Sequence, residues 1–271
     1  MITELMERVE RRIAGYGGGD AVVAFSGGVD SAVVTALAAR ALGPGHVTAV
    51  TAVSPSYPAG ELEAARATVA VLSVAHAVVE TREVEREAYA RNDAMRCYHC
   101  KAELYGVLRR IAAEANGSLV LAGANADDRL DVRPGLTAAE QQGVRNPLLE
   151  EGVGKASIRA VAARLELPVA DKPALACLSS RVAFGIRITP RLLARIDRAE
   201  QAVRALGFDP VRVRHFGDRA TIEVAPDDVS QLLAHPQLPE LIRTIQVMGW
   251  ADVEVDRSGY RQGRMNVPSD T

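Results

Sequence analysis

The segment Ala21–Ser31, Ala-Val-Val-Ala-Phe-Ser-Gly-Gly-Val-Asp-Ser, decides the fold of this 271-residue chain. Its first five residues are an apolar run typical of a short buried strand, and a helical pattern follows from about Asp30 to Leu42. Between them, two glycines let a ligand approach the backbone closely and two serines add hydroxyl groups. The amides at a helix start point outward with the positive end of the helix dipole, so the segment predicts an oxyanion-binding loop. A strand-to-helix turn in which Asp30 or Ser31 merely caps the helix is the alternative.

Strands and helices alternate along the chain on the carboxyl-terminal side of this loop. The expected strands are 47–53, 77–80 and 118–122, and the expected helices are 60–72 and 101–115, the latter starting just after Cys100. Such alternation is typical of crossover units in a parallel sheet covered on both faces. We therefore expect an α/β domain with a doubly wound parallel sheet over residues 1–175.

A second, smaller α+β domain is expected over residues 190–271. Its predicted elements are a helix over 192–206, strands over 211–215 and 220–224, a helix over 227–233 and a last strand over 251–255. The stretch 123–147 holds few apolar residues and reads as rich in loops.

Composition excludes several classes of protein. Lys+Arg count 32 and Asp+Glu count 34, a formal net charge of −2, which disfavours a basic nucleic-acid-binding protein. No run of 18 apolar residues is present, so we expect no membrane segment and a cytoplasmic location. Among the 32 basic residues only three are lysine, which makes Lys101, Lys155 and Lys172 mild pointers to sites that need a point charge.

The carboxyl ends of the predicted strands indicate where a nucleotide would bind, because ligands of such sheets lie beyond these ends. The loop that begins at Ser54 would lie near adenine and ribose, unless it is an ordinary polar loop. After the fourth strand, Asp128 or Asp131 is a candidate ligand for magnesium on a triphosphate, with turn capping or pairing to nearby arginines as the alternative. The glycine loop itself lacks the Gly-Lys-Ser/Thr of a Walker A motif, which disfavours kinase or motor chemistry.

The three cysteines form the second chemical signal. Cys97 and Cys100, in Cys-Tyr-His-Cys, have the spacing of a soft-metal pair, and Cys177 can add a third thiolate. Cys177 lies between Lys172 and Arg181, whose charges favour a reactive thiolate. The alternative is that cysteines serve as small buried apolar residues.

Several segments together resemble the LarE family of ATP-dependent sulfur transferases, which have the PP-loop of the N-type ATP pyrophosphatases. The matching segments, spread in order over nearly the whole chain, are 26–31, 96–101, 125–128, 131–135, 177–181, 211–215 and 259–266. The resemblance implies a PP-loop ATP pyrophosphatase fold, adenine nucleotide alpha-hydrolase-like, that binds ATP with Mg²⁺. The residues expected to bind the nucleotide are Ser26, Gly27, Gly28, Asp30, Ser31, Ser54 and Asp128.

The resemblance also implies a substrate and a reaction. Family members adenylate the carboxylates of pyridinium-3,5-biscarboxylic acid mononucleotide and convert them to thiocarboxylates, in biosynthesis of the nickel-pincer cofactor of lactate racemase. In one branch three cysteines hold a [4Fe-4S] cluster that carries the sulfur, and the set Cys97, Cys100 and Cys177 favours this branch. In the other branch the cysteine at the position of Cys177 gives up its own sulfur and becomes dehydroalanine, which is the fallback.

The phosphate of the substrate needs a binding site of positively charged residues, which we expect in the smaller domain. Arg212 and Arg214 alternate along a predicted strand, so both project from one face. Together with Ser180 and Arg181 they form the expected phosphate-binding site. The alternative is that this basic face of the strand is simply exposed to solvent. Two further acidic residues of this domain, Glu200 and Glu223, are candidates for a divalent ion or an oligomer contact. The resemblance also implies a homo-oligomer, of a number that the sequence leaves open, and makes coenzyme A a conceivable ligand.

Three other functions are compatible with part of the sequence. A PP-loop tRNA thiolase fits the loop, but the net charge, the 4% aromatic content and the lack of an RNA-binding module disfavour it. An amidotransferase-type synthetase would need a glutaminase domain, for which the chain has no room. A non-catalytic ATP-binding sensor would have no need for Cys177 beside basic residues, and it would release no pyrophosphate.

Overall fold

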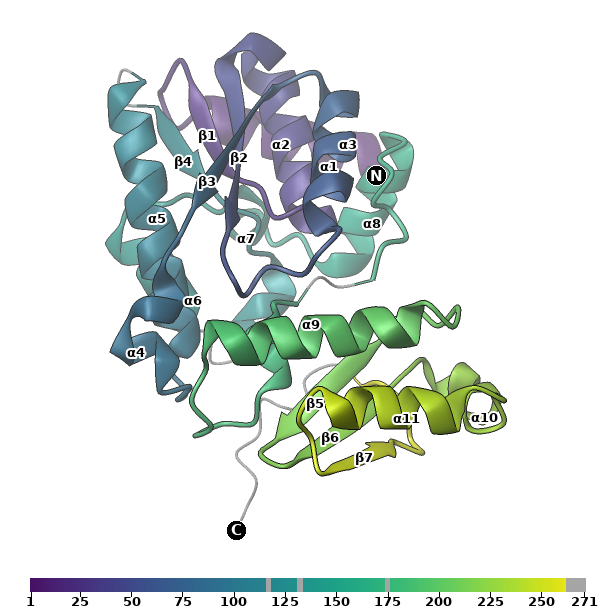
Figure 1. Cartoon of the computed structure of the whole chain (residues 1–271). Helices are drawn as coiled ribbons and strands as arrows, with labels where there is room; N and C mark the ends of the chain where they lie inside the picture. Colours follow the sequence, from purple (N-terminus) through teal and green to yellow (C-terminus); the bar gives the residue numbers. More distant parts are fainter. Residues whose placement is uncertain (116–117, 131–133, 174–175, 262–271) are drawn as a thin grey trace. The chain divides into compact units, whose positions relative to one another are not determined.

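The computed structural model describes residues 1–115, 118–130, 134–173 and 176–261 (Figure 1). The chain forms two compact units. The first comprises residues 1–54, 59–83 and 95–175, and the second comprises 55–58, 84–94 and 176–271. The second unit therefore takes two short segments from the first half of the chain.

A parallel sheet forms the centre of the first unit. In the described part of this unit its strands are β1 (Ala21–Ala24), β2 (Val47–Val53), β3 (Ala75–Glu80) and β4 (Leu119–Leu121), in the order β3-β2-β1-β4. Every neighbouring pair is parallel. Successive strands run outward from β1 to β3 on one side, while β4 adds to the other side of β1. The crevice for a ligand in such a sheet lies at this reversal of strand order, beyond the carboxyl ends of β1 and β4.

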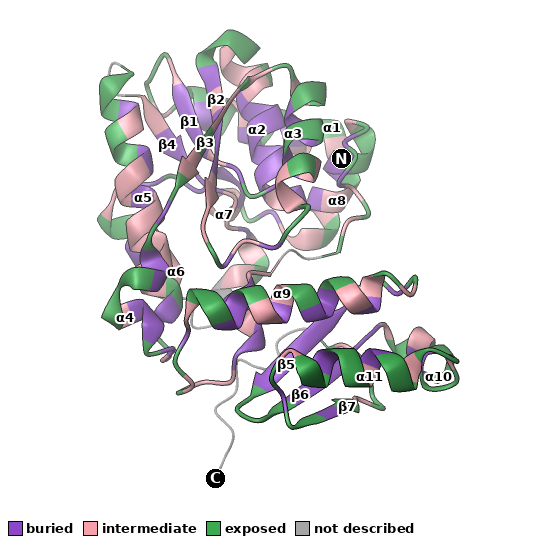
Figure 2. Ribbon diagram, in the orientation of Figure 1, coloured by how far each residue is buried: buried purple, intermediate pink, exposed green. Residues whose placement is uncertain are grey.

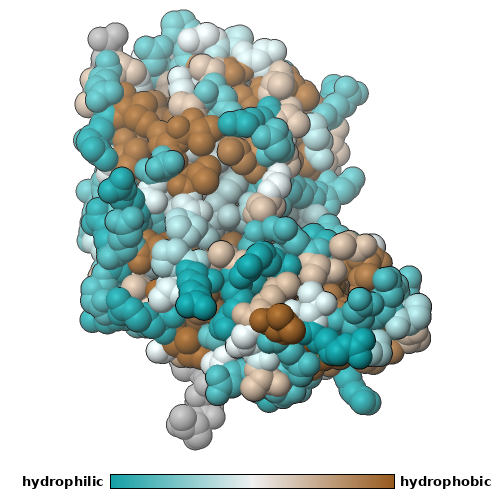
Figure 3. Space-filling model, viewed as in Figure 1, coloured by the Kyte–Doolittle hydropathy of each residue, from teal (hydrophilic) through white to brown (hydrophobic). Residues whose placement is uncertain are grey.

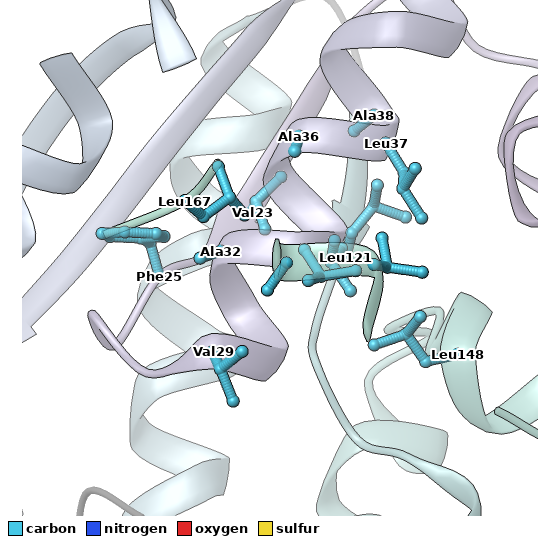
Figure 4. Close-up of a cluster of buried hydrophobic side chains, with 14 of the residues drawn as sticks. Val23, Phe25, Val29, Ala32, Ala36, Leu37, Ala38, Leu121, Leu148 and Leu167 are labelled. Carbon is cyan, nitrogen blue, oxygen red and sulfur yellow. The ribbon is translucent and has the colours of Figure 1, made fainter. Parts of the chain in front are cut away.

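Helices cover both faces of this sheet, which confirms the predicted α/β class. Val23 of β1 packs on one face with the helices α1 (Ile2–Ala14), α2 (Val29–Leu42), α3 (Glu61–Leu72) and α8 (Lys155–Arg164). Its neighbour Val22 faces the other way, toward α5 (Arg96–Glu114) and α6 (Pro134–Gln141), as the two-residue period of a strand requires. Helix α2 is buried along most of its length (Figure 2), and Figure 4 shows Ala32, Ala36, Ala38 and Leu37 in the core with Leu121 and Leu148.

Two expectations for this unit were wrong. Helix α5 begins at Arg96 rather than at residue 101. No glycine or proline interrupts residues 96–100, and no side chain caps the helix at Met95, so the sequence carries no signal of where this helix begins. The stretch expected to be rich in loops contains α6, which buries Ala138 and Ala139, and α7 (Pro147–Glu150). Short 3-10 helices among the described residues are Pro44–His46, Glu83–Glu85, Ala126–Leu130, Leu178–Arg181 and Pro226–Asp228.

A three-stranded mixed sheet and helices form the second unit. β5 (Arg212–Phe216) pairs antiparallel with β6 (Arg219–Glu223), and β7 (Asp252–Val255) runs parallel to β6. The helices in the described part of this unit are α4 (Glu87–Ala90), α9 (Pro190–Arg204), α10 (Val229–Leu233) and α11 (Leu238–Val247). This is the predicted α+β class, although α11 was not predicted. Thr189 caps α9 by accepting a hydrogen bond from the Leu192 amide, and Pro190 occupies the first turn.

The surface shows one apolar area on the first unit. Figure 3 shows apolar residues at the surface over the strands of the parallel sheet, beside α5. On the edge strand β3, Ala77 and Val79 are only partly buried, and Val78, on the opposite face of the strand, is 41% exposed. None of the helices in the described residues is both long enough and apolar enough to span a membrane.

A buried histidine in the second unit makes stability depend on pH. His215 is 5% exposed, and its Nδ1 accepts a 2.9 Å hydrogen bond from the indole N–H of Trp250. Burial, and next the charge of Arg195, lower the pKa of His215 from 6.5 to about 4. Because a protonated Nδ1 would donate rather than accept, the bond to Trp250 requires the neutral ring.

We therefore expect acid to destabilise the second unit through His215. Above pH 6.5 the ring is neutral in both states, and below it only the unfolded chain takes up the proton. The free energy of unfolding should fall by up to about 3 kcal/mol between pH 6.5 and 4. Denaturant titrations followed by the fluorescence of Trp250, the sole tryptophan, measure this. His215→Gln should flatten the dependence, and an unchanged slope in this variant would contradict the assignment.

Candidate functional site

The Ser26–Ser31 loop joins β1 to α2 at the reversal of strand order. Gly27 has φ of +79°, in the left-handed region that favours glycine, and Gly28 is the N-cap of α2. The Ser31 hydroxyl donates to the Gly28 carbonyl at 2.9 Å and accepts from the Ser26 amide at 3.2 Å. The Ser26 hydroxyl lies 3.2 Å from that of Ser31 and accepts from the Gly28 amide. The two serines therefore shape a cup in front of the helix start.

The segment after β4 packs against this loop. A Cβ atom on Gly123 would lie 2.9 Å from the Ser31 nitrogen, so only glycine allows the approach. Asn125, which is 6% exposed, donates from its side chain to Asp30 at 3.3 Å, and its own amide donates to Asp128 at 3.0 Å. Asp30 and Asp128, both predicted site residues, thus meet at Asn125. Asp131, the other candidate for magnesium, lies outside the described residues.

Two of the three lysines lie at the same loop. Lys155, the first residue of α8, forms an ion pair with Asp30. Lys172 donates to the Gly27 carbonyl at 3.4 Å and forms an ion pair with Glu61. The sequence prediction of nucleotide-binding residues did not include these lysines, Gly123 or Asn125. The scarcity of lysine was the one signal that pointed to Lys155 and Lys172.

Ser54 follows β2 directly, at the carboxyl edge of the same sheet. Its hydroxyl donates to the Glu83 carboxylate, which is 2% exposed. Ser54 therefore lies at the carboxyl end of a strand, where we predicted a nucleotide contact. The contact itself stays a prediction.

Cys97 and Cys100 lie in the first turns of α5 rather than in a loop before it. Residues three apart share a face of a helix, so the pair keeps the spacing of a two-thiolate ligand set. None of the three cysteines forms a disulfide bond, and Cys97 is exposed while the other two are partly buried. Within the described ranges, no three His, Cys, Asp or Glu side chains form a group that could hold a metal ion.

Cys177 belongs to the second unit, where it precedes the 3-10 turn Leu178–Arg181. Its carbonyl accepts hydrogen bonds from the Ser180 hydroxyl at 2.7 Å and from Nη1 of Arg181 at 2.8 Å. Arg181 is 1% exposed and forms a buried ion pair with Glu200 of α9 at 2.9 Å. Burial alone would raise the pKa of the Glu200 carboxyl, but the Arg181 charge and its hydrogen bonds hold that pKa below its ordinary value.

Arg212 and Arg214 project from one face of β5, as the alternation predicted. Their guanidinium groups lie 5.1 and 5.9 Å from the ring centre of Tyr260. Arg214 pairs with Glu223 at 2.9 Å and donates to the Ser180 carbonyl at 3.1 Å. Burial, and next the charge of Arg181, lower the pKa of Arg212. Glu223, like Glu200, therefore has an arginine partner.

Comparison with known proteins places the chain in a family. Residues 1–130 match the family model described as NAD synthase. The chain is 35% identical to the pyridinium-3,5-bisthiocarboxylic acid mononucleotide synthase of Lactiplantibacillus plantarum, with 90% of this chain and 88% of that protein covered. The chain belongs to the LarE family. The predicted LarE resemblance and the PP-loop fold class are both confirmed.

Two uncharacterised proteins extend the LarE comparison. A Synechocystis protein is 42% identical to the chain over 91% of each, and a Methanocaldococcus jannaschii protein is 25% identical over 89% of this chain and 90% of its own length. The predicted enzyme class, an ATP-dependent sulfur transferase of the PP-loop type, is confirmed by the LarE relationship. Membership of this class implies ATP with Mg²⁺ as its nucleotide.

Proposed function

We propose that this protein adenylates the carboxylates of pyridinium-3,5-biscarboxylic acid mononucleotide and converts them to thiocarboxylates. The product would be the one named for the Lactiplantibacillus plantarum relative, and it would serve biosynthesis of the nickel-pincer cofactor of lactate racemase. The observation that carries the proposal is a PP-loop cup at the reversal of strand order, in a chain 35% identical to that relative.

Adenylation is the task of the first unit. A substrate carboxylate oxygen attacks the α-phosphorus of ATP, the bond from this phosphorus to the β-phosphate oxygen breaks, and pyrophosphate leaves. The amides at the start of α2, with the hydroxyls of Ser26 and Ser31, would hold the β- and γ-phosphates. Asp30 and Asp128 offer the oxygen ligands that Mg²⁺ prefers, and Lys155 supplies a positive charge beside Asp30.

Binding of the substrate phosphate is the proposed task of Ser180, Arg212 and Arg214. Arg181, Arg212 and Arg214 are each at most 7% exposed, and Arg181 pairs with Glu200 while Arg214 pairs with Glu223. Guanidinium groups are planar forks of donors that suit phosphate oxygens, and two of them side by side on β5, next to Ser180, support a phosphate site here. Arg181 was part of the predicted phosphate-binding site, but the hydrogen bonds described for it go to Glu200 and to its own turn.

Sulfur transfer is the proposed task of Cys177. The acyl-adenylate carbon is open to attack by a sulfur nucleophile, and AMP leaves as the new carbon–sulfur bond forms. The thiolates of Cys97, Cys100 and Cys177 fit the donor chemistry of a [4Fe-4S] cluster, which when bound would carry an added sulfide, delivered from solution, for transfer to the acyl-adenylate. In the fallback, the Cys177 thiolate attacks directly, and loss of a proton from its Cα then breaks the Cβ–S bond, leaving dehydroalanine and the thiocarboxylate.

The reaction is tested with the purified full-length protein, ATP, Mg²⁺ and the pyridinium dicarboxylate mononucleotide. We expect pyrophosphate release that depends on this substrate, and a substrate mass increase of one sulfur-for-oxygen exchange per carboxylate. An ATP-binding sensor would release no pyrophosphate, and a tRNA thiolase would modify RNA and leave the mononucleotide unchanged.

The sulfur route is tested on protein purified anaerobically. Visible absorption together with four iron and four sulfide per chain, lost in Cys97→Ala with repeated turnover, is expected for the cluster route. A colourless protein whose Cys177 loses the mass of hydrogen sulfide after one turnover would instead establish the sacrificial route. Repeated turnover by Cys97→Ala would also contradict the cluster.

A further inference from the structure

Both peptide groups that flank Cys177 are held by hydrogen bonds. The Ala176 carbonyl, on the amino side, accepts from Nη1 of Arg181 at 2.7 Å. On the carboxyl side, the Cys177 carbonyl accepts from the same Nη1, and the Leu178 amide donates to the Ser56 carbonyl at 2.8 Å. Since each peptide group is planar, fixing both fixes φ and ψ of Cys177 and with them the direction of its Cα–Cβ bond.

A single guanidinium group spans the two carbonyls, and Glu200 holds that group from behind. Nε and Nη2 of Arg181 donate to the two oxygens of Glu200 at 2.9 and 3.2 Å, while Nη1 donates to the carbonyls of Ala176 and Cys177 and to the Ser180 hydroxyl at 3.1 Å. Glu200 is 0% exposed and also accepts from the Val213 amide of β5 at 3.1 Å. The pair thus connects the Cys177 turn to both α9 and β5.

Burying an ion pair is a poor way to gain stability, because the loss of hydration offsets much of the attraction. A well-packed apolar pair would hold α9 against the turn equally well. An apolar pair cannot donate hydrogen bonds to two successive carbonyls, whereas the planar guanidinium group of Arg181 does so.

We propose that Arg181 and Glu200 are positioning residues that fix the orientation of the Cys177 side chain for sulfur transfer. The inference rests on the proposed function, because it takes Cys177 as a residue of the sulfur route, either as a ligand of the cluster or as the donor. Neither Arg181 nor Glu200 contacts the reacting atoms in this role. Their effect therefore falls on sulfur transfer, and adenylation measured at saturating mononucleotide stays unchanged.

Arg181→Lys is the first test, since it keeps the positive charge near the thiol and loses the planar fork. One ammonium nitrogen replaces three guanidinium nitrogens and cannot hold Glu200 and both carbonyls together. We expect the rate of thiocarboxylate formation to fall roughly 10- to 100-fold, because small misplacements of a reacting group have effects of this size. Pyrophosphate release and KM for ATP should change less than about twofold.

A second measurement follows the turn without any reaction. Hydrogen exchange at the Leu178 amide should rise at least about tenfold in Arg181→Lys, because the turn that presents this amide to Ser56 is loosened. Glu200→Asp, which shortens the support behind the guanidinium, should change both measurements in the same direction and less. The fluorescence of Trp250, in the same unit, reports whether either variant remains folded.

Arg187→Lys is the matched control. Arg187 forms a two-bond pair with Glu87 in the same unit, at 2.7 and 2.6 Å, but both side chains are exposed. This variant should match the wild type in all measurements. Wild-type transfer and Leu178 exchange in Arg181→Lys would overturn the proposal, as would equal losses of transfer and pyrophosphate release. A wild-type protein that forms no thiocarboxylate would refute the proposed function instead, while Leu178 exchange would still decide whether the pair holds the turn.

Discussion

Cys177→Ala is expected to abolish thiocarboxylate formation while adenylation continues. Removing the sulfur proposed to attack the activated acid, or to hold the cluster that carries the sulfur, should lower transfer by at least about 1000-fold, as loss of a nucleophile generally does. Pyrophosphate release should stay within about threefold, because the loop proposed to bind ATP belongs to the first unit. Mass spectrometry of the mononucleotide and a pyrophosphate assay on the same sample separate the two steps.

The fold should tolerate this replacement. Cys177 is only partly buried, and the hydrogen bonds that hold its turn go to backbone atoms that alanine retains. Cys177→Ser is the matched control for shape, since it keeps a small polar side chain without sulfur, and the same loss of transfer is expected. Thiocarboxylate formed at a rate near that of the wild type by either variant would show that sulfur reaches the substrate by another route.

The parallel sheet was predictable because its strands and crossover helices each carry a strong local pattern. The helices that were missed lack such signals. Helix α11 has Leu241 and Ile245 as its buried residues, a weak stripe four residues apart, and α6 follows a polar segment. No capping residue marks the start of α5 at Arg96. These elements take their stability from packing against the sheet or against α9, which a local pattern does not encode.

The candidate site was predictable only where the chemistry is contiguous in sequence. The Ser26–Ser31 loop contains its own glycines, hydroxyls and helix start, so its shape follows from one hexapeptide. The Lys155 partner of Asp30 lies 125 residues away, and Gly123 matters only because its backbone meets Ser31. The phosphate-binding role of Arg181 stays a prediction, and its buried partner Glu200 could not be foreseen, because a sequence shows a charge but not the carboxylate that faces it.

Gly27→Ala is expected to have the largest effect on ATP use. The backbone of Gly27 has φ of +79°, where a side chain is strained, and a Cβ atom there would lie 3.1 Å from the Cβ of Ala65. The loop must shift to relieve this contact, which moves the Gly28 amide and the Ser26 hydroxyl that it contacts. Displacing phosphate-binding groups by a fraction of an ångström should lower pyrophosphate release on the order of 100-fold.

Gly19→Ala supplies the matched control for this effect. Gly19 precedes the same strand, its φ is not in the left-handed region, and no atom lies within 4 Å of a Cβ built on it. It should release pyrophosphate at the wild-type rate. Thermal unfolding of both variants separates loss of the loop from loss of the fold, because strain at one position should cost only about 1 kcal/mol. A folded Gly27→Ala variant with wild-type pyrophosphate release would show that the cup does not bind the phosphates, and the proposed adenylation would then need another site.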